Sequence, residues 1–371
     1  MDPGLRREEE SLPLIATLVD FLSSSNSRGP GRLAKALFCP GLPVSRRALE
    51  SPSPPLRGEA DDNLLSAAAA MGGGRLLIAS GADREYFPLL RDTVLSIRAQ
   101  RQDVALGILD LGLDGEQCDW LSPRVDHVVR PAWDLDFPGR ARTPDTFKAQ
   151  VARPFLRRHF PGYEVYLWVD ADAWLQDGRV IDLYVNAAGR DRLAITPEID
   201  RAYKRHYKRP KPFGWTLAWK NYRQAFGWRA ADRLGRNPMV NCGVFALHHD
   251  APHWEAWARV LSQVLQRTQF FFVEQTALNY VIFAEHLPVN FLPAYCNWMP
   301  GDAPPAYDAD RGLFVEPHAP HEVIGVMHLA GREQKTHLFL LNRLDGGTVE
   351  TSLRYSESRS LCGRSPGNSS A

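Results

Sequence analysis

Apolar residues along the chain fall into short continuous runs that alternate with longer amphipathic stretches. The runs at 76–80, 104–109 and 163–169 are typical of strands that are buried on both faces. Between the first two runs, residues 86–101 place apolar side chains three and four positions apart, which predicts an amphipathic helix. A strand, a helix and a second strand in close succession predict an α/β domain with a mostly parallel central sheet flanked by helices.

The rest of the chain up to about residue 330 continues this pattern. Further strands are expected at 125–129, 193–195, 241–247 and 323–327, and further helices at 116–121, 147–159, 254–268 and 274–283. Ligands of parallel α/β sheets lie beyond the carboxyl ends of the strands, so polar residues that follow strands are candidates for a site.

The two ends of the chain lack a sustained hydrophobic period. Residues 1–70, rich in Pro, Ser, Arg and Gly, predict a flexible extension or a small helical appendage. Residues 71–345 form the expected α/β domain, and residues 346–371 the expected disordered tail. The apolar piece at 12–22 carries Asp20 and follows three glutamates, so it predicts neither a signal peptide nor a transmembrane segment. A surface helix there would allow peripheral membrane contact.

Charge and cysteine content narrow the function classes. Lys and Arg total 44 against 43 Asp and Glu, a formal net charge of +1, so no overall field favours nucleic acid. The basic segment 201–211 adjoins no nucleic-acid module, and we exclude a nucleic-acid partner. The five cysteines lack C-x-x-C spacing, which predicts reduced thiols in a cytoplasmic protein. His248, His249 and His253 lack the spacing of zinc ligands and are expected at the surface.

The apolar run 163–169 ends in two carboxylates, Asp170 and Asp172. Alternate residues of a strand share a face, so these two side chains project the same way. Two like charges held this close repel each other unless a cation lies between them. A hard divalent metal fulfils this role, and a diphosphate completes its coordination shell. The alternative is a strand end followed by an ordinary acidic turn.

Other short motifs occur before and after this pair in a definite order. Four of them follow or begin predicted elements, and the fifth, Arg153, lies within a predicted helix seventeen residues before Asp170. The motifs are Ala79 with Asp83 and Tyr86, then Arg153, then Asn241-Cys242-Gly243-Val244, then Glu274-Gln275-Thr276, and finally His328-Leu329-Ala330-Gly331 with Lys335 beyond it.

In this order and spacing, from about residue 76 to residue 335, the chain resembles the family-eight retaining glycosyltransferases of the GT-A fold. This family includes glycogenin and bacterial lipopolysaccharide galactosyltransferases. The resemblance implies transfer of a sugar from a nucleotide-sugar donor, a UDP-sugar, with retention of anomeric configuration and with Mn²⁺ or Mg²⁺ as cofactor. It implies a saccharide, a lipid-linked molecule or a protein as the acceptor.

The resemblance also implies roles for individual residues. Ala79, Asp83 and Tyr86 would hold the nucleotide base, for which an aromatic face and a carboxylate are suited. Gly331 and Lys335 would lie near the diphosphate, although the usual family lysine position is Gln334 here.

The remaining motifs would surround the metal and the donor sugar. By resemblance, Asp170, Asp172 and His328 bind the metal, and Arg153 contacts the donor or its phosphates. Asn241 would hydrogen-bond the sugar, Glu274 would hold its hydroxyls, and Gln275 would lie near the reacting anomeric carbon. Thr276 replaces the second acid of the family's Asp-Gln-Asp segment.

Two other interpretations stay open on the residues alone. A phosphatase of the haloacid dehalogenase type also ends its first strand in Asp-X-Asp, but here two strands precede the motif. A nucleotide-sugar- or glycan-binding protein without turnover would keep the same fold. Because no carboxylate is evident beside Gln275, the sequence favours front-face transfer over a covalent glycosyl-enzyme.

Overall fold

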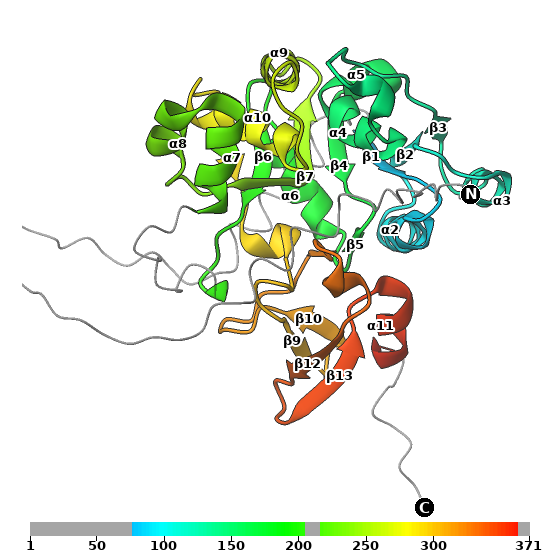
Figure 1. Ribbon diagram of the computed structural model, residues 1–371. Helices are drawn as coiled ribbons and strands as arrows, with labels where there is room; N and C mark the ends of the chain where they lie inside the picture. The colour runs from blue at the N-terminus through cyan, green and yellow to red at the C-terminus, as the bar shows by residue number, and fades with distance from the viewer. Residues whose placement is uncertain (1–75, 205–215, 363–371) are drawn as a thin grey trace, which may run out of the picture. The chain divides into compact units, whose positions relative to one another are not determined.

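The computed structural model of the chain describes residues 76–204 and 216–362 (Figure 1). The predicted extension at 1–70, the last residues of the predicted tail and most of the basic segment 201–211 lie outside these residues. Every predicted site residue lies inside them, so the position of each can be compared with its expected role.

A seven-stranded sheet forms the centre of the described part of the chain. Neighbouring strands run parallel except that β7 is antiparallel to both of its neighbours, β4 and β6. The predicted α/β class with a mostly parallel central sheet is confirmed. In spatial order the strands are β3 (His127–Val129), β2 (Ala105–Asp110), β1 (Leu76–Ala82), β4 (Val165–Val169), β7 (Val240–His248), β6 (Leu193–Pro197) and β8 (Val289–Phe291).

Helices cover both faces of this sheet because both sets of alternating side chains in its central strands are apolar. Tyr166 and Trp168 of β4 pack in a cluster with α9 and α10, whereas Leu167 and Val169 pack in a cluster with α2 and α6 (Figure 1). None of the described helices is both long enough and apolar enough to cross a membrane. The main helices are α2 (Phe87–Gln100), α3 (Gly115–Leu121), α6 (Arg179–Ala187), α7 (Leu217–Phe226), α8 (Trp228–Leu234), α9 (His253–Leu265) and α10 (Val273–Phe283).

The single helix predicted at 147–159 is wrong. Pro154 has no backbone N–H and its ring crowds the preceding turn, so the helix is interrupted there. The interruption leaves Arg153 in a short 3₁₀ turn, where its side chain is buried beside β4. The segment consists of η4 (Asp145–Phe147), α4 (Lys148–Ala152), η5 (Arg153–Phe155) and α5 (Leu156–His159), preceded by η3 (Arg140–Arg142).

Small antiparallel pairs of strands follow the acidic end of β4 and form much of the chain after β8 (Figure 1). The first of them pairs β5, which begins directly after Asp172, with β11, which ends at His328. The elements are β5 (Ala173–Leu175) with β11 (Val326–His328), β9 (Ala306–Asp308) with β10 (Leu313–Val315), β12 (Leu338–Asn342) with β13 (Thr348–Ser352), the turns η7 (Ala294–Asn297) and η8 (Glu333–Lys335), and α11 (Tyr355–Cys362).

The disordered tail predicted from residue 346 is wrong as far as residue 362. Strand β13 and helix α11 occupy this part, and the indole N–H of Trp174 donates to the carbonyl of Leu353 at 2.8 Å. The partner strand β12 carries Leu340 on its exposed side and Leu341 on its buried side. Because both sides are apolar, the alternation that predicts a strand is not visible in the sequence.

Candidate functional site

The predicted site residues gather at one edge of the sheet. Strands β1, β4 and β6 run in the same direction and are followed at this edge by Asp83, Asp170 and Glu198. Strand β7 runs the opposite way, so its beginning, with Asn241, lies at the same edge. The sheet therefore brings together polar residues that are far apart in the chain.

Three potential metal ligands meet at the end of β4. Oxygen and nitrogen atoms of Asp170, Asp172 and His328 lie within 4.8 Å of one another. Nε2 of His328 is 3.4 Å from Oδ1 of Asp172 and 3.9 Å from Oδ2 of Asp170. Two carboxylates suit Mg²⁺ or Mn²⁺, and the added imidazole suits a transition metal, so the donor set fits Mn²⁺.

A close backbone approach allows His328 to reach the two aspartates. A Cβ atom on Gly243 would lie 2.2 Å from Cε1 of His328 and 2.9 Å from its Nδ1. The carbonyl of Gly243 in turn accepts a hydrogen bond from the N–H of Asp170 at 2.7 Å. Only glycine fits between the imidazole and the strand, which explains the glycine in the Asn-Cys-Gly-Val motif.

Lys335 neutralises the carboxylate of Asp172, with 2.6 Å between Nζ and Oδ2. Burial alone would raise the pKa of Asp172, but the hydrogen bond and charge of His328 and the charge of Lys335 lower it well below its usual range. Burial would lower the pKa of His328, but its contacts with Asp172 and Asp170 raise that pKa above its ordinary value. The site thus holds compensated charge inside the protein.

Arg153 neutralises the other carboxylate. Its guanidinium forms an ion pair with Asp170, lies 3.1 Å from Oε2 of Glu274, and covers the ring of Trp168 at 5.0 Å. Glu274 is 2% exposed, and its Oε1 has no hydrogen-bond partner among the described residues. Burial raises the pKa of Glu274 to about 7, although Arg153 opposes the rise. An unpaired buried oxygen of this kind can accept a hydrogen bond from a ligand hydroxyl.

Of the three residues predicted to hold the nucleotide base, Tyr86 lies close to Lys335 and Asp83 is hydrogen-bonded to Tyr86. Oδ1 of Asp83 accepts the N–H of Tyr86 at 2.8 Å, and Nζ of Lys335 lies 5.2 Å from the centre of the Tyr86 ring. Lys335 also donates to the carbonyl of Gly331 at 3.3 Å. Ala79, in contrast, is fully buried inside β1, so the structure does not bring it to the site.

A carboxylate that we did not predict joins the two amides of the site. Oε1 of Glu198 accepts from Nδ2 of Asn241 at 3.1 Å and from Nε2 of Gln275 at 3.3 Å. The expectation that no carboxylate lies beside Gln275 is therefore wrong, and front-face transfer is no longer favoured over a covalent glycosyl-enzyme. Glu198 directly follows β6, the same strand-end signal that marks Asp170, so the sequence did contain a signal for it.

Asn297 is a second residue that the sequence did not indicate. It lies in η7 and is fully buried, and its Oδ1 is 2.9 Å from Nδ1 of His328. No hydrophobic period or recognised motif surrounds it, so only the packing of η7 against β11 brings it to the site.

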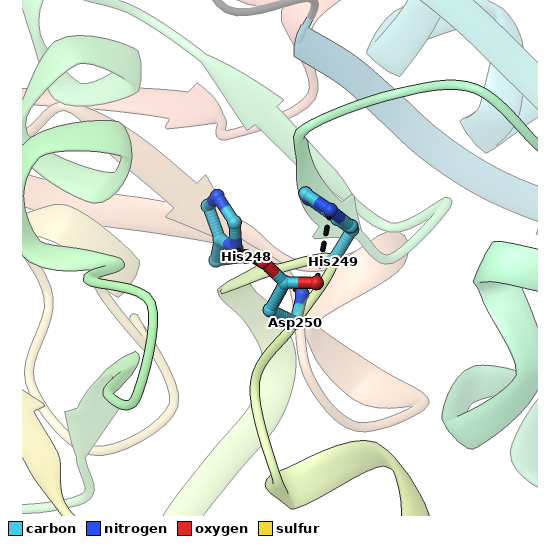
Figure 2. Close-up of side chains that lie close together, drawn as sticks. All are labelled: His248, His249 and Asp250. Carbon is cyan, nitrogen blue, oxygen red and sulfur yellow. Dashed lines mark hydrogen bonds and ion pairs between the residues drawn. The ribbon is translucent and has the colours of Figure 1, made fainter.

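A second group of metal-ligand side chains, His248, His249 and Asp250, lies at the opposite edge of the sheet (Figure 2). His248 is 4% exposed, so its predicted place at the surface is wrong. Its Nδ1 accepts the N–H of Asp250 at 3.1 Å, and its Nε2 lies 3.5 Å from Glu164. The Asp250 oxygens contact His249 at 3.0 Å and Arg190 at 3.2 Å. With these partners, the group ties the end of β7 to the start of β4.

Three solved structures with a similar chain arrangement are glycosyltransferases. The galactosyltransferase LgtC, in complex with donor and acceptor sugar analogs, is 15% identical with a TM-score of 0.48, covering 77% of this chain and 95% of that one. The bifunctional glycosyltransferase WbbM is 14% identical with a TM-score of 0.45, covering 80% and 51%. GlyE of Streptococcus pneumoniae is 13% identical with a TM-score of 0.46, covering 79% and 61%.

No family model and no curated protein matches the chain. Identities of 15% or less and TM-scores below 0.5 are too low to transfer an activity from these structures to this chain. The function therefore has to be inferred from the site itself.

We predict that Gly243→Ala weakens Mn²⁺ binding by at least about tenfold, because the added methyl group displaces the imidazole of His328. Electron paramagnetic resonance of free Mn²⁺ measures the affinity. Gly115→Ala is the matched control, since a Cβ atom there meets nothing within 4 Å. A folded Gly243→Ala protein that binds Mn²⁺ as tightly as the wild type would contradict this account of the glycine.

The pKa of Glu274 predicts a pH dependence of stability. With a pKa of about 7 in the folded state against an ordinary 4.5, the folded protein holds a proton that the unfolded chain releases between these pH values. The free energy of unfolding should therefore fall as pH rises from 4.5 to 7. Glu274→Gln removes this contribution, so denaturant unfolding should show a flatter profile for the variant. Parallel profiles would show that Glu274 ionises normally.

Proposed function

We propose that this protein is a metal-dependent glycosyltransferase that transfers a sugar, with retention, from a UDP-sugar to an acceptor. One observation supports this most strongly. The ligand atoms of Asp170, Asp172 and His328 lie within 4.8 Å of one another, and Lys335 pairs with Asp172. Asn297 joins His328 to the amide of Asn241, and Glu198 joins that amide to Gln275. A diphosphate at the cations and a sugar at the amides would be adjacent in such a site.

The charges of the site suit a diphosphate leaving group. Breaking the bond between the sugar and the diphosphate builds negative charge on the leaving oxygen, and Mn²⁺ held by Asp170, Asp172 and His328 would act there as a Lewis acid. Lys335 stands beside Asp172 and is placed to donate to a phosphate oxygen. Its neighbour Tyr86, 44% exposed, offers an aromatic face for the base.

The other half of the site suits a sugar. Asn241 and Gln275 present amides, and the unpaired Oε1 of Glu274 can accept a hydrogen bond from a sugar hydroxyl. The Glu198 carboxylate next to both amides would favour positive charge developing on the sugar ring. A saccharide, a lipid-linked molecule or a protein would serve as the acceptor.

The surroundings of Asp170 do not support a phosphatase of the haloacid dehalogenase type. In that mechanism an aspartate after the strand has to attack phosphorus. Here Oδ1 of Asp170 accepts the indole N–H of Trp168 at 2.7 Å and pairs with Arg153, which lowers its nucleophilicity. A role as a metal ligand through the other oxygen fits these contacts better.

We predict that a panel of UDP-sugars will contain a donor that the protein hydrolyses slowly with Mn²⁺ and not with a chelator. Asp172→Asn should lower this rate by about 100-fold or more, because it removes a charge that holds the metal at the leaving group. Release of UDP measures the rate. Asp177→Asn is the control, since Asp177 pairs with Arg179 away from the site.

Other results would select the alternatives. Hydrolysis of a phosphate monoester without hydrolysis of any nucleotide sugar would identify a phosphatase. Stabilisation of the protein against heat by a UDP-sugar and Mn²⁺, with neither hydrolysis nor transfer, would identify a binding protein without turnover. Equal activity in chelated samples would overturn the metal dependence.

A further inference from the structure

A continuous chain of hydrogen bonds runs from the metal-ligand cluster to the predicted sugar side of the site. Nδ1 of His328 lies 2.9 Å from Oδ1 of Asn297, and Nδ2 of Asn297 donates to Oδ1 of Asn241 at 3.1 Å. Nδ2 of Asn241 then donates to Oε1 of Glu198, which also accepts from Gln275. His328, Asn297 and Asn241 are each at most 8% exposed, so water cannot easily replace these contacts.

The orientation of the Asn241 amide is determined at both of its ends. The N–H of Gly243 donates to Oδ1 of Asn241 at 2.9 Å, and a backbone N–H can only donate. At the other end, Oε1 of Glu198 accepts from Asn241, which requires the NH₂ group on that side. Exchanging the oxygen and nitrogen of Asn241 would break both hydrogen bonds.

This orientation propagates to the imidazole. Since Oδ1 of Asn241 accepts, Asn297 has to turn its NH₂ group toward Asn241 and its oxygen toward His328. Nδ1 of His328 therefore has to carry a proton in order to donate to that oxygen. In the neutral ring, Nε2 is then left as the unprotonated nitrogen, and Nε2 is the atom that faces Asp170 and Asp172.

We propose that Asn297 is a positioning residue that holds His328 in the tautomer able to bind a metal through Nε2. This inference rests on the proposed metal site and adds one residue that no motif indicated. Asn297 accepts the hydrogen bond from Nδ1 directly, as the outer partners of metal-bound histidines commonly do. The N–H of Gly243 and the carboxylate of Glu198 together set the direction of the hydrogen bonds through Asn241.

The first test measures Mn²⁺ affinity without any donor. Asn297→Leu removes the acceptor for the Nδ1 proton and should weaken binding by about 10- to 100-fold. Asn290→Leu is the matched control, because Asn290 lies in the edge strand β8 and donates to the carbonyl of Ala187 at 2.8 Å. Thermal unfolding reports whether both variants fold. Wild-type affinity in a folded Asn297→Leu protein would overturn the inference.

The second test observes the tautomer itself. Protein labelled with ¹⁵N-histidine is studied without metal at an alkaline pH at which the ring is neutral, and the His328 signal is assigned with His328→Gln. We expect the proton on Nδ1 in the wild type. In Asn297→Leu it should move to Nε2, where Asp172 can accept it. A wild-type ring protonated on Nε2 would overturn the inference even if Asn297→Leu did not fold.

The two proposals fail in different ways. If the wild type binds Mn²⁺ but Asn297→Leu binds it equally well, only the positioning role is wrong and the glycosyltransferase proposal stands. If the wild type binds no Mn²⁺, the metal site is wrong and both proposals fail with it.

Discussion

Two carboxylates one residue apart, at the end of a strand with no solvent on either face, impose the constraint on which the site depends. In a medium of low dielectric constant, the repulsion between Asp170 and Asp172 is large unless positive charge lies close to both. Arg153 and Lys335 supply that charge from two separate parts of the chain. The broken helix before β4 and the turn η8 are therefore parts of one electrostatic arrangement.

The same arrangement divides the site into two halves. On one side, Lys335 joins the metal ligands to Tyr86 at the end of the first strand. On the other, His328 is joined through two buried asparagines to Glu198 and Gln275. A donor with a nucleotide at one end and a sugar at the other would span both halves, with its diphosphate at the metal between them.

Much of the fold could be predicted because strands buried on both faces leave a continuous apolar run in the sequence, as in β4. Prediction failed where local patterns mislead. The apolar spacing at 147–159 resembles one helix, but Pro154 interrupts it. Strand β12 has leucines on both sides and so shows no alternation. The motif order placed the metal ligands together, but it also included Ala79, whose position inside β1 is too buried for a ligand.

By itself, the sequence determined the α/β class, the acidic strand end and the candidate ligands, because hydrophobic period and strand-end polarity are properties of neighbouring residues. Only the tertiary structure decided that Glu198 and Asn297 belong to the site, and which ring nitrogen of His328 faces the carboxylates. These contacts join residues dozens of positions apart. They depend on strand order, on the direction of β7 and on the space above Gly243 that the His328 ring occupies. No local pattern of residues encodes those features.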